Sequence, residues 1–555
     1  MKRHILPFIL ILFVSYWAIR PLVGSGYFPM HDDTQVARVI VMGRALLNGQ
    51  FPVRLVSGLG YGYGYPLFNF YGPLPYYFGG GLSAVGVDPV VATKIMMAVG
   101  MVLAGISMYV FGAAVFGRTA GILAAALYVF APYHAVLLFV RGAVGELWGY
   151  ALLPIIFLGW YIGKNPKRER SGIWIGGLGL AGVILSHTIT GYVIVVLYTV
   201  GLLLCSLIFL LKKKLLSSYV RFHALVLMVG LGLSAFFWVP AIIEMGYTNV
   251  ADQIGGGADF RDHFVCAGQL WNSLWGFGGS VRGCIDGLSF KAGKLHIVLG
   301  IVGLLFAVAH LKKGFWNHTV GLLSLIAIGS VVMTTSFSRP VWEWVPGMSF
   351  IQYPWRFLSG IALSLSAVGA SLLVWINNRG VRVTLCMTIC IVVIITSAKL
   401  FIPQYMYEKP TALFESPEDI SWRASRVSDE YLPSGFQAPA SIDHIARGIV
   451  LSDPNGGLRV ETEIDTETYG KLQIESRTSR KITLNRVYFP GWDYWVNGKR
   501  QEIVVENGLP VIVVPQGRSV VELRFGNTLP RIIGIILSIG ILICFFKTYG
   551  KKAFT

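Results

Sequence analysis

Long apolar segments separated by polar loops dominate the chain. Segments of about 18 to 22 apolar residues are long enough to span a bilayer as helices. They predict twelve transmembrane helices, near residues 5–23, 90–112, 119–138, 147–163, 172–188, 190–211, 220–240, 292–310, 318–335, 357–376, 382–401 and 529–546. The first segment has no clear small-residue cleavage site and carries Arg20-Pro21 near its end, so we expect an anchor and not a signal peptide. Both termini are then cytoplasmic.

Four polar segments, 24–89, 241–291, 336–356 and 402–528, lie on the opposite side of the predicted membrane. In the last of them, apolar and polar residues alternate over 458–464, 471–477 and 520–525, as in half-buried strands. Asn497-Gly498 predicts a hairpin between 494–496 and 503–505, and 508–514 is a further strand candidate.

The predicted fold is therefore a polytopic α-helical membrane protein with an extracytoplasmic β-sandwich-like domain near its C-terminus. Residues 1–401 form the transmembrane domain, which includes the long first outer loop 24–89. Residues 402–528 form the β-rich domain. Residues 529–555 form the final helix and a basic cytoplasmic tail.

Composition supports a membrane protein and excludes other classes. Of the 555 residues, 54% are hydrophobic and 13% are charged, about half the charged fraction of a soluble domain. Mean hydropathy is +0.62. Soluble enzymes, disordered scaffolds, secreted disulfide modules and collagen-like chains do not have this composition.

The net charge of +18 does not indicate nucleic-acid binding. Eighteen basic residues and one acidic residue, Glu169, lie at the termini and on alternate loops such as 164–170 and 212–214. The rest of the chain is nearly neutral, so the excess follows the positive-inside rule for multi-pass proteins. We expect a protein of the cell (plasma) membrane whose partners include membrane lipids but no nucleic acid.

The six cysteines are too few for a disulfide framework. Four of them lie in apolar spans and are most simply buried small hydrophobes. Cys266 and Cys284 share one outer loop and are candidates for a disulfide, although the sequence leaves a free pair equally open.

The first outer loop carries an acidic pair, Asp32-Asp33, directly after His31. Asp33 precedes residues 34–47, whose apolar spacing suits a helix lying on the bilayer, and an Asp there can cap it. Capping needs one carboxylate, so Asp32 is free to act as a general base or a metal ligand. His31 either tunes this site or sits at the interface. The glycine- and aromatic-rich residues 58–78 are typical of a belt at the headgroup level. A surface on which sugars stack and a surface that admits a lipid-borne substrate are the alternatives.

Charged residues and a histidine also lie at other outer membrane faces. Arg141 and Glu146 are five residues apart, and either form an internal ion pair or have a functional role. His187 is a weaker candidate, since a lone histidine is more often structural. Arg356 enters the membrane from outside with no partner that the sequence identifies. Its planar donor fork suits a phosphate or diphosphate, and snorkelling to the headgroups is the alternative.

Several nucleotide and hydrolase motifs are absent from the sequence. The chain has no glycine-rich phosphate loop ending in Lys-Ser/Thr, no His-Glu-x-x-His, no Cys-x-x-Cys and no Gly-x-Ser-x-Gly. This argues against ATP-driven transport by this chain, against a zinc hydrolase and against a serine hydrolase. We see no internal repeat of the kind found in many transporters.

Five motifs together resemble a known family. A cytoplasmic N-terminus, one span and an outer loop with an acidic pair look like the C-type membrane glycosyltransferase superfamily. More narrowly, the sequence resembles the membrane family labelled 6-pyruvoyl-tetrahydropterin synthase-related, and its C-terminal motif also resembles YfhO-like proteins. The motifs are Met30-His-Asp-Asp33, Phe68-Asn-Phe-Tyr-Gly-Pro-Leu-Pro-Tyr-Tyr77, Arg141-Gly142 with Glu146, Gln352-Tyr-Pro-Trp-Arg-Phe357 and Tyr488-Phe-Pro-Gly-Trp-Asp-Tyr-Trp-Val-Asn-Gly498. Nothing in them supports pterin chemistry.

The superfamily resemblance implies an inverting sugar transfer from a lipid-linked (polyprenyl phosphate or diphosphate) donor to an extracytoplasmic glycan, lipid or protein. Asp32 or Asp33 would be the base. Arg356 would hold the leaving phosphate, with Arg141 and His187 as weaker candidates and His31 and Glu146 in support. No cofactor is certain, and a divalent metal on Asp32 or Asp33 is possible under this resemblance. The alternatives are a lipid or glycolipid transporter and a non-catalytic protein of envelope polysaccharide assembly.

Overall fold

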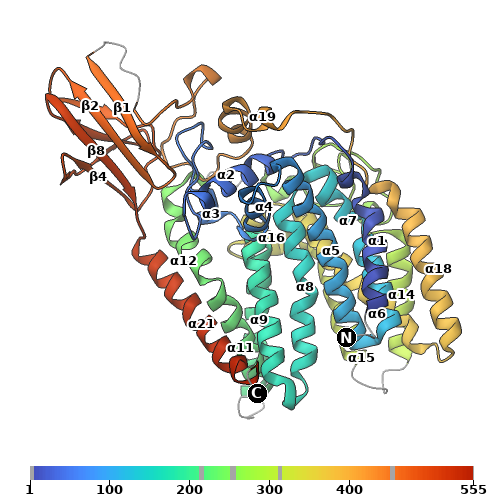
Figure 1. Cartoon of the computed structure of the whole chain (residues 1–555). Helices are drawn as coiled ribbons and strands as arrows, with labels where there is room; N and C mark the ends of the chain where they lie inside the picture. The colour runs from blue at the N-terminus through green and yellow to red at the C-terminus, as the bar shows by residue number, and fades with distance from the viewer. Residues whose placement is uncertain (1–4, 212–217, 251–257, 310–315, 451–456, 554–555) are drawn as a thin grey trace.

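The computed structural model describes residues 5–211, 218–250, 258–309, 316–450 and 457–553. Its long helices run side by side in one bundle, and its strands gather beyond one end of that bundle (Figure 1). Both chain ends lie at the other end (Figure 1). The sheets and the termini thus occupy opposite ends, as the predicted topology requires.

Every apolar segment predicted to span the membrane contains a helix. The long bundle helices are α1 (Ile5–Val23), α5 (Pro89–Phe116), α6 (Arg118–Val129), α8 (Val144–Gly163), α9 (Glu169–Ser186), α10 (Thr188–Leu211), α11 (Ser218–Leu233), α12 (Ala235–Glu244), α14 (Lys294–Ala309), α15 (Trp316–Thr334), α17 (Leu358–Ser371), α18 (Arg379–Ser397) and α21 (Leu529–Ala553). Within the described ranges, seven helical spans are long and apolar enough to cross a membrane, and nine if two bent pairs each count as one span. Helices α14 and α15 are apolar but shorter. The predicted count of twelve is therefore not established.

Glycine residues let neighbouring helices approach closely. A Cβ on Gly159 of α8 would lie 2.3 Å from the backbone nitrogen of Gly176 of α9. A Cβ on Gly172 would lie 2.4 Å from the Cα of Gly163. Small residues allow such backbone contact between membrane helices. These contacts fix α9 against α8, which carries Glu146.

The first outer loop is buried, contrary to two expectations from the sequence. It contains α2 (Gln35–Leu47), α3 (Leu67–Phe70) and α4 (Leu74–Ala84). Ten of the thirteen residues of α2 are buried, so this helix has no exposed polar face of the kind that an interfacial helix presents to water. The aromatic residues of 58–78 are also largely buried and do not form a headgroup belt. Segment 407–432 covers the loop: the backbones of Tyr27 and Tyr407 exchange two hydrogen bonds, each 2.8 Å long.

The chain also contains short helices and a disulfide. The short helices include α7 (Pro132–Ala135), the π-helix Val136–Arg141, α13 (Ala267–Trp271), α16 (Arg339–Trp344), the 3-10 helix Pro354–Phe357, α19 (Thr411–Phe414), the π-helix Glu418–Ala424 and α20 (Ser425–Val427). A disulfide joins Cys266 and Cys284. The loop that it closes contains Phe277, whose carbonyl accepts a 2.9 Å hydrogen bond from His31 Nε2.

The β-rich region contains two antiparallel sheets. Strands β1 (Leu458–Asp465), β2 (Tyr469–Ser476), β8 (Gly517–Phe525), β4 (Trp492–Val496) and β5 (Lys499–Arg500) form one sheet in that order, and β3 (Arg480–Thr483), β7 (Leu509–Val514) and β6 (Val504–Glu506) form the other. Asn497 and Gly498 have positive φ angles and form the predicted turn. Its second strand is β5, however, and the predicted partner 503–505 overlaps β6 of the other sheet. Whether the two sheets form a sandwich stays a prediction.

One apolar core joins these parts. Buried side chains of α5, α6 and α8 belong to the same contiguous cluster as Phe68 and Phe70 of the first loop and Leu472 and Leu523 of the sheets. The first outer loop therefore lies between the bundle and the β-rich region, with apolar contacts to both, and its polar residues are held in a fixed place.

The direction in which the chain crosses the membrane gives a testable prediction. Because the basic loops belong inside, an impermeant thiol reagent added to intact cells should label Ser434→Cys and leave Ser171→Cys unlabelled. Ser434 is exposed, so its reaction is not limited by burial. The background should lack the free cysteines and keep the disulfide. Outside labelling of Ser171→Cys would reverse the assignment.

Candidate active site

The turn that carries the acidic pair lies against the turn that follows Arg141. The backbone N–H groups of His31 and Asp32 donate to the carbonyls of Val140 and Arg141, at 3.0 and 2.9 Å. The Gln35 amide donates to the Gly142 carbonyl at 2.9 Å. These bonds bring together two motifs that are more than 100 residues apart.

Gly142 permits this close approach. Its φ is +67°, a conformation that favours glycine, and a Cβ there would lie 2.1 Å from the sulfur of Met30. Any side chain would displace Met30, next to the acidic pair. The Arg141-Gly142 sequence thus combines a charged side chain with a backbone turn that no other residue fits.

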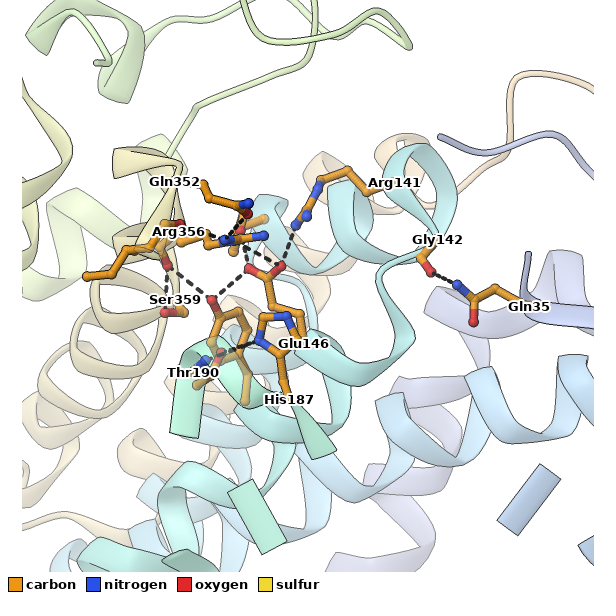
Figure 2. A network of polar contacts seen from close by, with 12 residues as sticks. Gln35, Arg141, Gly142, Glu146, His187, Thr190, Gln352, Arg356 and Ser359 are labelled. Carbon is orange, nitrogen blue, oxygen red and sulfur yellow. Dashed lines mark hydrogen bonds and ion pairs between the residues drawn. The ribbon is translucent and has the colours of Figure 1, made fainter. Parts of the chain in front are cut away.

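Glu146 is the centre of a buried polar network (Figure 2). Its side chain is fully buried at the start of α8. One carboxylate oxygen accepts hydrogen bonds from the hydroxyls of Tyr133 and Tyr150, at 2.6 and 2.7 Å. The other lies 2.5 Å from Arg141 Nη1 and 3.9 Å from Arg356 Nε. The internal Arg141–Glu146 pair considered from the sequence is present, and Arg356 is part of it.

Arg356 is held by the backbone as well as by Glu146. Its Nη1 donates to the Ile351 carbonyl at 2.6 Å and to Gln352 Oε1 at 3.2 Å. Gln352 has a φ of +65°, which is rare for a residue other than glycine. The side chain of Arg356 is 11% exposed. Arg356 therefore has partners, which hold its guanidinium in place, and little of its side chain is exposed to solvent.

Aromatic rings and a histidine complete the cluster. The guanidinium of Arg141 lies 4.5 Å from the ring centre of Trp355, and Arg356 lies 5.0 Å from that of Tyr353. His187 follows α9 and hydrogen-bonds through Nδ1 to Thr190 at 2.7 Å (Figure 2). It is close enough to interact with the charge of Glu146. Two arginines against one glutamate leave one positive charge, which can attract a phosphate.

Asp32 is available for chemistry. In the part of the chain that the structure describes, nothing donates a hydrogen bond to its carboxylate, which is partly exposed. It lies near enough to Arg141 to interact with its charge. Among the predicted site residues, Asp32 thus combines an open carboxylate with a neighbouring cation.

The sequence suggested that Asp33 caps helix α2, but the structure shows that it does not. The N-cap residue is Thr34, and it makes no side-chain cap bond. The Asp33 carboxylate instead accepts a 2.8 Å hydrogen bond from Arg423 Nη1, which also bonds the Asp33 carbonyl. Burial raises the pKa of the Asp33 carboxyl above its ordinary value, although Arg423 opposes this.

The residues that hold Asp33 were not predicted. Asp419 binds Arg423 through two hydrogen bonds of 2.7 and 2.9 Å and binds Lys409 at 2.5 Å. Burial alone would raise the pKa of Asp419, but the bonds from Arg423 and Lys409 lower it. The i, i+4 spacing of Asp419 and Arg423 was a weak signal in the sequence. Nothing in the sequence indicated a partner 390 residues away.

The acidic pair does not fit a metal site. Among the described residues, no group of three or more His, Cys, Asp or Glu side chains could hold a metal ion. Asp33 is engaged by Arg423, and the guanidinium of Arg141 lies near Asp32. Cations so near the two carboxylates disfavour a second cation, so no step proposed below passes through a metal.

Comparison with a family model assigns the chain to a family. The model described as "6-pyruvoyl-tetrahydropterin synthase related domain; membrane protein" matches residues 68–404. The chain belongs to this membrane-protein family. The match includes Arg141, Glu146, His187 and Arg356 and begins after the acidic pair.

An uncharacterized protein of Lactococcus lactis subsp. cremoris (strain MG1363) is 26% identical over an alignment of 357 residues, which covers 61% of this chain and 54% of the relative. The chain thus matches about half the length of that relative. Among solved structures, the chain is similar to an Archaeoglobus fulgidus oligosaccharyltransferase (14% identity, 82% of this chain, 61% of the other, TM-score 0.48). It is also similar to the arabinofuranosyltransferase AftD from Mycobacteria (16% identity, 74% of this chain, 28% of the other, TM-score 0.43). A third similar structure is ArnT from Cupriavidus metallidurans bound to undecaprenyl phosphate (12% identity, 67% of this chain, 78% of the other, TM-score 0.34). These likenesses concern the fold and do not establish an activity.

The expected phosphate-binding role of Arg356 can be tested by mutation. Arg356→Lys should reduce function by about tenfold or more if Arg356 binds a phosphate, because lysine keeps the charge and loses the planar donor fork, one nitrogen of which bonds Ile351 and Gln352. The measurement is the rate of the sugar transfer proposed below, with the purified variant. Arg382→Lys is the matched control, since Arg382 also donates to backbone carbonyls, of Ile376 and Asn377, on another helix. Normal transfer by Arg356→Lys would remove the phosphate role.

Proposed function

We propose that this chain is a membrane glycosyltransferase. It would move a sugar from a polyprenyl-phosphate-type donor to an extracytoplasmic glycan, glycolipid or glycoprotein, with inversion at the anomeric carbon. The observation that carries the proposal is the contact between two turns: one presents the open carboxylate of Asp32, and the other presents Arg141 of the Arg141–Glu146–Arg356 cluster. Inverting transfer from a lipid phosphate requires a base on one side of the anomeric carbon and a phosphate-binding cation on the other, and the two turns supply one group each.

Each group has a defined part in the proposed reaction. The Asp32 carboxylate accepts the proton of the acceptor hydroxyl, whose oxygen forms a bond to the anomeric carbon of the donor sugar. The bond from that carbon to the phosphate oxygen breaks, and the phosphate leaves with the electron pair. Arg356 and Arg141 stabilise the charge that develops on the leaving phosphate.

Glu146 is a positioning residue in this proposal. It is buried, bonds two tyrosine hydroxyls and faces both arginines. It therefore fixes the two guanidinium groups before a donor arrives and leaves one positive charge uncompensated. Such preorganisation lowers the cost of stabilising charge in the transition state. His187 and His31 border the cluster and the acidic turn, and we assign them a supporting role.

A transfer assay tests the proposal. The purified chain in liposomes should release polyprenyl phosphate and glycosylate an acceptor when supplied with the lipid-linked sugars extracted from a strain that lacks the chain. That strain should accumulate the donor. If the chain only moves the lipid-linked sugar between leaflets, it is a transporter. If extracts show neither transfer nor donor accumulation, an assembly role replaces the enzyme.

A further inference from the structure

A polar cavity lies between the first outer loop and the β-rich region. It has a volume of about 610 Å³. Ser57 and two glycines of the first loop form one wall, Glu418 and Ser421 of the π-helix Glu418–Ala424 form another, and Arg447 lies on a third. Asp465 and Arg486 of the β-rich region complete it. Three parts of the chain far apart in sequence thus meet around one space.

The charges of the lining are balanced. Glu418 and Asp465 carry negative charges, and Arg447 and Arg486 carry positive ones. Asp465 and Arg486 form an ion pair. Glu418 and Arg447 are exposed and, within the described chain, neither makes an ion pair within 4 Å. They are free to act as one acceptor and one donor for the same ligand.

Ser421 adds a hydroxyl to the lining of the cavity. The residue is only 7% exposed. Its hydroxyl has no hydrogen-bond partner among the described residues, although it lines the cavity. This hydroxyl is open to the cavity, so it can donate a hydrogen bond to a ligand or water and accept one from it.

The cavity shares one helix with the acidic site. Asp419 and Arg423 of the π-helix Glu418–Ala424 bind each other, and Arg423 holds Asp33. Glu418 and Ser421 of the same helix line the cavity. A Cβ on Gly58 would lie 3.2 Å from Ile420 of this helix, so the first loop packs closely on it. The π-helix Glu418–Ala424 therefore contacts both the cavity and the acidic pair.

We propose that this cavity binds a neutral sugar unit of the acceptor. The inference rests on the proposed transferase function and names the acceptor class at its site. Balanced charge disfavours a phosphate or an acidic sugar, because the carboxylates of Glu418 and Asp465 would face it. The lining offers few apolar side chains, so it does not suit a lipid tail. Hydroxyl groups, which both donate and accept, match a carboxylate, a guanidinium and a serine hydroxyl in one space.

A binding measurement tests the proposal without any transfer step. Saturation-transfer NMR of the purified full chain in nanodiscs should detect contact with neutral disaccharides, with maltose and cellobiose as probes. Glu418→Gln and Arg447→Gln should each weaken binding about tenfold, because each loses a charge-assisted hydrogen bond. Ser421→Phe should abolish it by filling the space. Glu415→Gln and Arg459→Gln are matched controls, since these exposed residues do not line the cavity and should bind as wild type does.

The outcomes separate this inference from the proposed function. Absence of binding by both disaccharides, or equal binding by wild type and the Glu418 and Arg447 variants, would overturn the sugar site. Competition by inorganic phosphate would overturn its neutral character. In the transfer assay, the same variants should raise the acceptor KM about tenfold and leave the donor KM unchanged. Transfer by wild type with unchanged acceptor KM in the variants would sink only this inference, whereas no transfer by wild type would sink the proposed function.

Discussion

Asp32→Asn should lower sugar transfer by about 100- to 10,000-fold, the usual contribution of a general base. Asparagine keeps the size and a hydrogen-bond acceptor but cannot take up a proton at neutral pH. Asp32 makes no side-chain hydrogen bond with the described residues, so its loss should leave expression and membrane insertion normal. The measurement is the transfer rate per mole of folded protein in liposomes.

Two other aspartates of the same loop serve as comparisons. Asp33→Asn should have a smaller effect, because Asp33 is held by Arg423 and asparagine can still accept one hydrogen bond from it. Asp88→Asn should transfer normally, since Asp88 caps helix α5 through the N–H groups of Val90 and Val91 and asparagine caps equally well. If Asp33→Asn lowers the transfer rate more than Asp32→Asn does, Asp33 is the base and Asp32 is not. Near-normal transfer in the double variant would end the proposed mechanism.

The sequence predicted those features that depend on the residues of a single segment. Apolar length predicted where the bundle helices lie, and alternation predicted β2 and β8, whose side chains alternate between buried and exposed. Alternation also predicted β1, although that strand is exposed along nearly its whole length. The candidate residues Arg141, Glu146, His187 and Arg356 could be selected because charge and imidazole are rare near membrane spans. Their assembly around one carboxylate depends on how α8, α9 and α17 pack. No local pattern carries that information.

The environment of helix α2 and the partner of Asp33 were not predicted, because a distant part of the chain covers both. Helix α2 has the spacing of an interfacial helix, yet segment 407–432 covers the face that would otherwise meet water, and Arg38 bonds Ser428 across this contact. The same segment supplies Arg423, so Asp33 forms an ion pair instead of a helix cap. A pattern of apolar positions shows which face is buried by the bundle, and it cannot show a second cover contributed by a distant part of the chain.

Glu146→Gln should destabilise the protein more than any other single change considered for the cluster. Removing one partner of a buried ion pair costs about 3–5 kcal/mol, because the remaining charges stay buried without compensation. Here Arg141 and Arg356 both face the lost carboxylate, while the acceptors for Tyr133 and Tyr150 are largely retained. The measurement is the free energy of unfolding of the purified chain in detergent, followed by tryptophan fluorescence.

Two variants show whether the effect comes from buried charge. Glu169→Gln removes the partner of Arg221 from an ion pair whose arginine side chain is 63% exposed, and it should cost no more than about 1 kcal/mol. Adding Arg141→Gln to Glu146→Gln should cost less than the sum of the two single changes, because the second change removes a charge that the first left unpaired. Strictly additive costs, or an unfolding free energy of Glu146→Gln equal to that of Glu169→Gln, would mean that Glu146 does not hold the two arginines through its charge. Their preorganisation for a phosphate would then need another source.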